Sequence, residues 1–328
     1  MTMKRIAILA IAAGALLAPA AGAQELLKIA TGKPDATNSQ MMKAIINACP
    51  NLVEEDTDTT GGADNVGKLV ANQVHGGIAQ VDVVQFLEKT EPAISKLKSL
   101  VALNPNYLHV IAATKGFVVE PAQKGTLGFG GKPEVRGKIT KFTDLNNRTV
   151  AANGSAQLTL RVIADKLNLN INIVDADDRK AGLDMLANGQ VAAFVAMGGK
   201  PVEWVGKLDG SVFELVPVGQ DIAEKLGAPY SAQKLTYKNL NAFGFATVSV
   251  KNELIVRDYK GAKGAQLQQL RDCFVANVDA IRETTGTHPA WQEVEDLTTT
   301  QWATYTGEAK AVPASAPAPA AKPVKGKS

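Results

Sequence analysis

Residues 26–49 read LLKIATGKPDATNSQMMKAIINAC and hold a complete strand–turn–helix unit. The run Leu26–Thr31 is apolar enough for a buried β-strand, and Gly32–Thr37 contains the residues typical of a loop. The apolar side chains that follow recur at the spacing of one helix face, at Met42, Ile45, Ile46 and Cys49. The stretch therefore predicts one strand and one helix of an α/β fold.

The same alternation recurs in two sets along the chain. In the first set we expect further strands at Leu52–Glu55 and Gly77–Val81, each followed by a helix. The second set contains in order the strand Arg148–Ala152, the helix Ser155–Leu167, the strand Ile171–Val174, the helix Asp178–Leu186, the strand Val191–Ala196, the helix Pro201–Lys207 and the strand Phe213–Val218. Two sets of this kind predict two α/β lobes with mostly parallel sheets.

The segments outside these sets indicate how the lobes connect. Leu108–Thr114 is an apolar strand, and Gly116–Gly137 is rich in glycine and lysine, as in an exposed hairpin or loop. The long alternating strand Ala242–Val250 can lead back to the first lobe, and a strong helix follows at about Gly264–Glu283. We therefore expect the chain to return to the first lobe at its end.

Composition and charge narrow the function. The 328 residues are enough for about two domains, and a hydrophobic fraction of 45% is that of an ordinary globular protein. Six of the 35 basic residues lie near the two ends of the chain, so the part between them has 29 basic and 32 acidic residues. These six are Lys4, Arg5, Lys310, Lys322, Lys325 and Lys327. A nucleic-acid binder normally carries a basic patch on its folded part, so we expect no nucleic-acid partner.

The first 23 residues have the pattern of a secretory signal. Lys4 and Arg5 precede an apolar run, Ile6–Leu17, and the small residues Ala21–Ala23 form a cleavage site before Gln24. The run is shorter than the ~20 apolar residues of a membrane helix. We expect an exported, periplasmic protein with a disordered Ala/Pro/Lys tail at 310–328.

Two cysteines, Cys49 and Cys273, remain in the exported part. An even number in an oxidising compartment favours a disulfide. The alternative is two separate buried thiols, since both cysteines fall on the apolar side of a predicted helix.

Patterns typical of enzymes are weak. Gly62–Lys68 approaches a phosphate-binding loop, but Leu69 stands where Ser or Thr would hold Mg²⁺. Asp56 and Asp58 resemble the Asp-x-Asp of Mg-dependent phosphohydrolases, which we keep as an alternative function. The three histidines share no metal-ligand spacing, at His75, His109 and His288. We therefore expect a protein that is not an enzyme, with no catalytic residues, metal or cofactor.

Small polar turns at strand ends are more informative. Open α/β sheets bind ligands at the carboxyl ends of their strands, where helix N-termini present unpaired amides that suit a carboxylate. Four such turns occur, at Thr31-Gly32-Lys33, Thr60–Asp64, Ala79-Gln80-Val81-Asp82 and Asn153-Gly154-Ser155-Ala156. Each alone could be a helix cap, but four turns in both sets predict a shared cleft.

These motifs, in this order, resemble the TAXI family of solute receptors of TRAP transporters over about residues 26–290. The resemblance rests on Thr31-Gly32, Thr60–Asn65, Gln80-Val81-Asp82, Asp144-Leu145-Asn146 with Val150, Gly154-Ser155, Leu186–Phe194 and Gly198-Gly199-Lys200-Pro201. The sequence departs from the family pattern at Ala36–Ser39, where an aromatic pair is usual, at Ala63 in place of Ser and at Ala192 in place of Asp.

The resemblance implies an α/β fold of the type II periplasmic-binding-protein kind, with two lobes around a hinge. The first lobe would span 24–114 and 243–309, and the second 115–242. Such a receptor, a monomer, captures a small organic anion, amino acid or dicarboxylate-like, and delivers it to TRAP-type membrane subunits.

Twelve residues are predicted to bind this solute between the lobes. Those of the first lobe are Thr31, Gly32, Lys33, Thr60, Gly61, Gly62, Gln80 and Asp82, and those of the second are Gly154, Ser155, Gly199 and Lys200. Lys33 and Lys200 would pair with its carboxylate. The alternative from another class is an exported scaffold with a receptor-like body, whose tail contacts anionic envelope surfaces.

Overall fold

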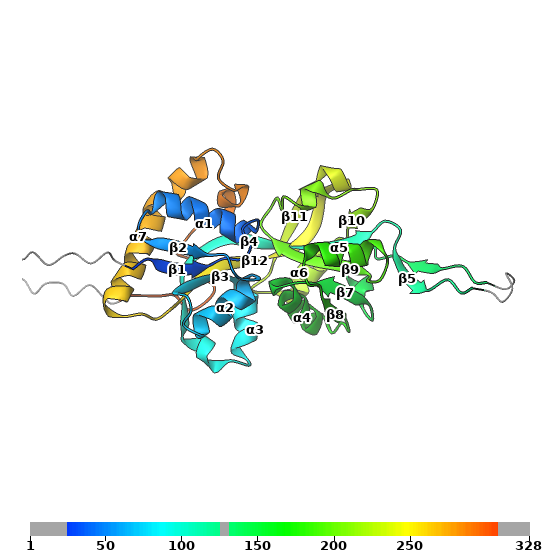
Figure 1. Cartoon of the computed structure of the whole chain (residues 1–328), viewed down its shortest axis with the longest axis horizontal. Helices are drawn as coiled ribbons and strands as arrows, with labels where there is room; N and C mark the ends of the chain where they lie inside the picture. Colours follow the sequence, from blue (N-terminus) through cyan, green and yellow to red (C-terminus); the bar gives the residue numbers. More distant parts are fainter. Residues whose placement is uncertain (1–24, 125–130, 308–328) are drawn as a thin grey trace, which may run out of the picture.

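The computed structural model describes residues 25–124 and 131–307, and they form two lobes joined at a waist (Figure 1). The predicted signal at 1–23 and the tail at 310–328 lie outside the described residues. No helix in the described ranges combines the length and the apolar character needed to cross a membrane.

The first lobe alternates strands and helices, as the sequence predicts. Its parallel strands have the order β2-β1-β3. Its elements are β1 (Leu27–Ala30), α1 (Thr37–Ala48), β2 (Val53–Asp56), α2 (Gly62–Val70), β3 (Gly76–Gln80), α3 (Val81–Glu88), the 3₁₀ turns η1 (Pro92–Lys96) and η5 (Pro289–Glu293), and α7 (Gly261–Glu283).

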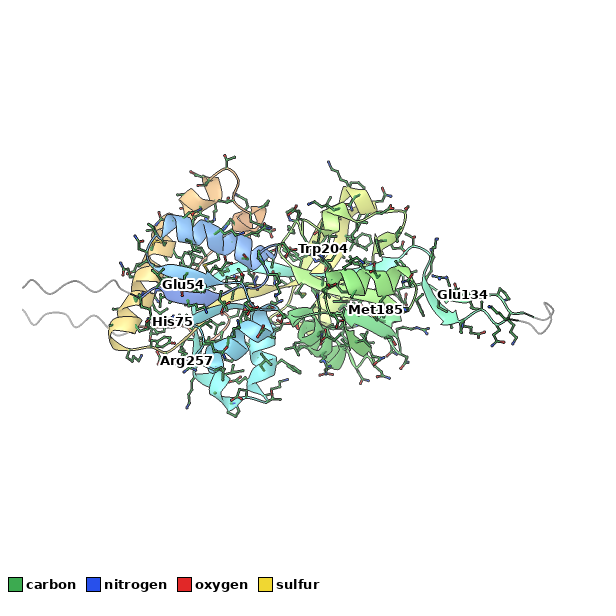
Figure 2. All side chains as sticks on the ribbon, in the orientation of Figure 1. Glu54, His75, Glu134, Met185, Trp204 and Arg257 are labelled. Carbon is green, nitrogen blue, oxygen red and sulfur yellow. A yellow bond between two sulfur atoms is a disulfide. The ribbon has the colours of Figure 1, made fainter. Side chains whose placement is uncertain are left out.

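The second lobe repeats the pattern with the parallel order β8-β7-β9. Its elements are η2 (Phe142–Leu145), β7 (Thr149–Ala152), α4 (Ser155–Leu167), β8 (Asn172–Asp175), α5 (Arg179–Ala187), β9 (Ala193–Gly198), η3 (Val205–Lys207), β10 (Phe213–Leu215), α6 (Gln220–Leu226), β11 (Ser231–Tyr237) and η4 (Lys238–Leu240). A hairpin of β5 (Phe117–Glu120) and β6 (Val135–Gly137) projects from this lobe, with Glu134 on it far from the cleft (Figures 1 and 2).

Two long antiparallel strands, β4 (Leu97–Ala113) and β12 (Ala242–Arg257), run through both lobes. In the first lobe β12 pairs with β3, and in the second it pairs with β11 while β4 pairs with β9 and β10. The pairing shifts register between Lys251 and Glu253, where the strands pass from one lobe to the other. The chain thus returns to the first lobe, and the α/β fold of two lobes around a hinge is confirmed.

Apolar side chains fill both faces of each sheet. In the first lobe α1 and α7 pack on one face, and α2 with α3 on the other. In the second lobe α4 and α6 share one cluster and α5 lies in another. Cys49, which follows α1, is bonded to Cys273 of α7, so the disulfide is confirmed and joins the beginning and the end of the first lobe.

Some local predictions are wrong because distant partners decide the backbone. Only η3 forms in the predicted helix Pro201–Lys207, and the Val202 amide ahead of it donates to Tyr237 Oη of the distant strand β11. β4 begins at Leu97 and not at Leu108, because β12 pairs with its first half, including Pro105 and Asn106, in a stretch without a strand pattern. The helix α6 and the strand β11 are absent from the sequence prediction.

A buried histidine links β4 to the second lobe. His109 is fully buried; its Nδ1 donates to the Tyr107 carbonyl at 2.9 Å, and its Nε2 accepts from Tyr237 Oη at 2.8 Å. Burial lowers the pKa of His109 to about 4. The imidazole is therefore neutral at pH 7, and both of its nitrogens are used in the fold.

His109 makes stability depend on pH. Below about pH 6.5 the unfolded chain binds a proton on His109, which the folded state accepts only near pH 4. The neutral His109 imidazole therefore makes its full contribution to the free energy of unfolding above about pH 6.5. About 2 kcal/mol of that free energy is lost between pH 7.5 and pH 5. Urea unfolding at several pH values measures this slope, and His109→Gln should flatten it. An equal slope in both proteins would contradict this role.

Candidate functional site

A cleft of about 660 Å³ lies between the lobes and is lined by both. Its size is that of a pocket for a small molecule. The first lobe contributes the loops before α1 and α2, and the second contributes the loops before α4 and α5 and the end of β9. The structure has a second hollow, beside Glu25 and the start of α7, but it is lined by residues of that one face and lacks converging groups from other elements.

Four helices begin at this cleft. The residues before α1, α2 and α4 are Ala36, Gly61 and Gly154, and none caps its helix with a side chain. Only α5 is capped, by Asp178, whose carboxylate accepts from the Ala181 amide at 2.8 Å. Uncapped first-turn amides carry partial positive charge and lack intrahelical partners. The cleft is therefore suited to an anionic group held by main-chain donors.

Glycine allows the backbones of the two lobes to approach each other here. Gly61 has φ 121° and Gly154 φ 53°, in the region that favours glycine. A Cβ on Gly154 would lie 2.5 Å from the Thr60 carbonyl oxygen, and a Cβ on Gly62 3.1 Å from Ser155 Oγ. In this space Ser155 Oγ accepts a hydrogen bond from the Ala63 amide across the cleft, at 3.0 Å.

The floor of the cleft is polar without being charged. Thr31, Gln80, Asn106 and Ser155 are buried and line it. Thr31 Oγ1 donates to Glu55 Oε1 at 2.6 Å, whereas the buried Asn106 Oδ1 has no hydrogen-bond partner in the described part of the chain. A solute donor can satisfy that oxygen.

Charged side chains gather at the rim. Arg179 of α5 bridges the lobes by pairing with Asp35 at 3.0 Å, and its guanidinium lies 5.2 Å from the centre of the Trp204 ring. Figure 2 shows Trp204 close to the junction of the two lobes. Lys33 and several carboxylates also face the rim, at Asp175, Asp177, Asp178 and Glu203. Burial lowers the pKa of His288, which lines the same cleft, so its imidazole is neutral at pH 7.

The cleft brings together nine of the twelve predicted residues. These nine are Thr31, Gly32, Lys33, Thr60, Gly61, Gly62, Gln80, Gly154 and Ser155.

Three predicted residues lie outside the cleft because each has another partner. The Asp82 carboxylate is buried against Thr159 and Tyr230. The Gly199 amide donates to Thr37 Oγ1 at 3.3 Å, and Lys200 Nζ pairs with Glu293 at 2.7 Å, above the Tyr107 ring. Lys200 is therefore held away from a solute carboxylate.

The residues of the phosphohydrolase alternative do not face the cleft. Asp56 accepts from Lys28 and Lys68, each at 3.3 Å, and Lys68 also bonds the Asp58 carbonyl at 2.5 Å. Burial raises the pKa of Asp56, but bonds from the Asp58 amide, Lys68 and Lys28 outweigh it and lower that pKa overall. Across residues 25–124 and 131–307, no three His, Cys, Asp or Glu side chains are grouped to hold a metal ion.

Sequence reasoning missed several residues of the cleft. Asp178 follows a predicted strand and has the pattern of a helix cap, which is the signal used for the other turns. Because Arg179 is the next residue, this signal could have identified it as well. No local pattern identifies Asn106 and Trp204, because β4 was not expected there and the helix predicted for 201–207 does not form.

Comparisons with known proteins give a fold-level likeness. No protein-family model matches the chain, and no curated protein matches it. The solved substrate-binding protein of an amino acid ABC transporter is 12% identical, with 78% of this chain and 94% of that chain covered and a TM-score of 0.46.

Two further structures are similar to the same degree. The periplasmic binding protein of an arginine transport system from Legionella pneumophila is 12% identical, with 83% and 100% of the two chains covered and a TM-score of 0.46. The GluR0 ligand-binding core from Nostoc punctiforme, solved with L-glutamate, is 12% identical, with coverage of 78% and 97% and a TM-score of 0.42.

The close approach at Gly62 can be tested against a glycine of the same helix. A Cβ at Gly62 would lie 2.8 Å from Gln80 Oε1 and 3.1 Å from the Ala79 backbone, whereas Gly67 has open space around it. We expect Gly62→Ala to lower the free energy of unfolding by about 1–3 kcal/mol, and Gly67→Ala to raise it by about 0.5–1 kcal/mol. Urea denaturation measures the free energy of unfolding of both variants. Equal stabilisation by both substitutions would show that the space around Gly62 does not require glycine.

Proposed function

We propose that this protein is a periplasmic solute receptor that closes its two lobes around a small organic anion. The observation that carries the proposal is that the N-termini of α1, α2 and α4, none capped by the residue before it, face one cleft from both lobes. In α2 the Ala63 amide is bonded to Ser155 Oγ of the other lobe. A solute that contacts both lobes binds the closed form better than the open form and so shifts the population toward closure.

The charge arrangement supports a carboxylate-bearing solute. Main-chain amides supply donors at the floor, and Lys33 and Arg179 supply cations at the rim. Arg179 is already paired with Asp35, so a carboxylate would have to compete with that pair. The rim carboxylates favour a solute that also carries an ammonium group, such as an amino acid.

The resemblance to TAXI receptors suggests the role after capture. In this proposal the exported monomer delivers its solute to TRAP-type membrane subunits and carries out no chemistry itself. Uptake of the captured solute by vesicles containing such subunits tests the delivery step.

The binding step is tested with a panel of dicarboxylates and amino acids, first by thermal shift and then by calorimetry. A ligand that binds only the folded state raises its melting temperature. Each acid that binds is compared with its uncharged amide, which should bind at least about tenfold more weakly, because charge-assisted hydrogen bonds to the amides are lost.

Ser155→Ala and Ser95→Ala form a matched pair for this test. Ser155 Oγ lies in the cleft and accepts from the Ala63 amide, while Ser95 is exposed and its Oγ donates to the Pro92 carbonyl. We expect Ser155→Ala to weaken binding about fivefold and Ser95→Ala to leave it unchanged. A panel in which no acid binds, or in which the neutral amides bind equally well, would refute the proposed anion receptor.

A further inference from the structure

A buried carboxylate lies at a contact between the lobes, outside the cleft. Asp82, in the first turn of α3, is 1% exposed. Its Oδ2 accepts from Thr159 Oγ1 of α4 at 2.8 Å and from Tyr230 Oη at 2.9 Å, both in the second lobe. Its Oδ1 is buried without a hydrogen-bond partner in the described part of the chain. One side chain of the first lobe thus holds two residues of the second.

This contact is coupled to the cleft through one helix. Thr159 lies one turn after Ser155 on α4, on the same helix face, and Ser155 bonds the Ala63 amide across the cleft. The contact of Asp82 with Thr159 therefore sets how closely the N-terminus of α4 approaches the glycine turn of α2. Opening the lobes would separate these groups and expose Asp82 to water.

No cation balances this carboxylate in the described part of the chain, where no ion pair involves Asp82. Lys166 of α4 lies 5.6 Å above the ring of Tyr230, the residue that donates to Asp82, and it donates to the Leu226 and Ala228 carbonyls. Other charged or titratable groups on elements packed against α3 are Asp64 and Lys68 of α2, Lys96 of η1 with Glu91 just before it, Arg161 and Asp165 of α4, and Lys251, Glu253 and Arg257 of β12.

We propose that Asp82 is a positioning residue whose carboxyl binds a proton as the lobes close, so that closure, and with it solute affinity, strengthens as the pH falls. The claim about solute affinity rests on the proposed receptor function, whereas the claim about closure does not. Burying an ionised carboxylate without a cation is costly, whereas a protonated carboxyl can be buried with two hydroxyl partners.

The sign of the effect follows from the two states. When the lobes open and water reaches Asp82, burial no longer disfavours the charged carboxylate, so its pKa is lower than in the closed state. In the closed state burial raises the pKa of Asp82, and the bonds from Thr159, from Tyr230 and from the amides of Val83 and Asp82 oppose that rise only in part. The closed form therefore binds more protons. The closed form is therefore favoured at low pH, and this advantage is lost as the pH rises through the raised pKa.

His288 at the cleft has the opposite effect. Burial lowers its pKa, so closure around a neutral imidazole is favoured as the pH rises. A decrease in closure with rising pH therefore cannot come from His288. A variant at Asp82 separates the effect of Asp82 on closure from that of His288.

The distance between the lobes can be measured without a solute. Spin labels at Lys43→Cys on α1 and Lys180→Cys on α5 occupy exposed positions in the two lobes, and the native cysteines of the described chain are bonded to each other. Double electron–electron resonance from pH 5 to 8.5 gives the closed and open populations. We expect the closed-to-open ratio to fall with rising pH, by up to about tenfold per pH unit.

Three variants test the assignment. Asp82→Asn mimics the protonated carboxyl and should abolish the pH dependence while keeping the lobes closed. Thr159→Val removes a donor that favours the ionised form, and should move the loss of closure to higher pH. Asp165→Asn changes an exposed carboxylate of the same helix and should behave as the wild type.

A closed fraction that is independent of pH in the wild type, or a slope that persists in Asp82→Asn, would overturn the assignment. If Asp82→Asn does not fold, an unchanged profile in Thr159→Val would overturn it as well. These outcomes leave the anion receptor standing, because they need no solute. Conversely, if no dicarboxylate or amino acid in the panel binds, the proposed function is refuted. The spin-label distances then still test whether closure depends on pH.

Discussion

The antiparallel pairing of β4 and β12 is the constraint on which the rest of this structure depends. Each strand belongs to the sheets of both lobes, so the lobes cannot slide past each other without breaking many backbone hydrogen bonds. The pairing shifts register between Leu254 and Ile255 and also between Lys251 and Glu253. Asn252 lies at this shift, fully buried, and donates to Asn38 of α1 and to Asn104 of β4. The hinge strands are thus tied directly to a helix that borders the cleft.

This constraint places glycine turns of the two lobes face to face. Because Gly62 and Gly154 lack side chains, the main chains come close enough for Ser155 to bond the Ala63 amide. The resulting cleft offers polar groups and helix N-termini at its floor, while formal charges are kept at its rim. Main-chain donors are fixed by the helices that carry them, so little side-chain entropy is lost when a ligand is bound.

Contacts on both sides of the cleft hold the lobes together. Arg179 pairs with Asp35 at the rim, and Lys200 pairs with Glu293 beyond the cleft. Both pairs are partly exposed, so solvent and salt weaken them. Asp82 differs because it is fully buried, and its protonation therefore has a larger effect on the energy of closure.

The alternation of strands and helices could be predicted from the sequence, as could the return of the chain, a possible bond between Cys49 and Cys273, and the turns at Thr31, Gly61 and Gly154. These are local signals: a hydrophobic period, a glycine, a strand end. Three further contacts emerge only in the folded molecule: Lys200 pairs with Glu293, Asp82 bonds Thr159 and Tyr230, and Asn106 faces the cleft. Each of these depends on partners far along the chain or on the pairing of β4 with β12, and no residue pattern within one segment encodes which distant group will neutralise a charge or satisfy a buried oxygen.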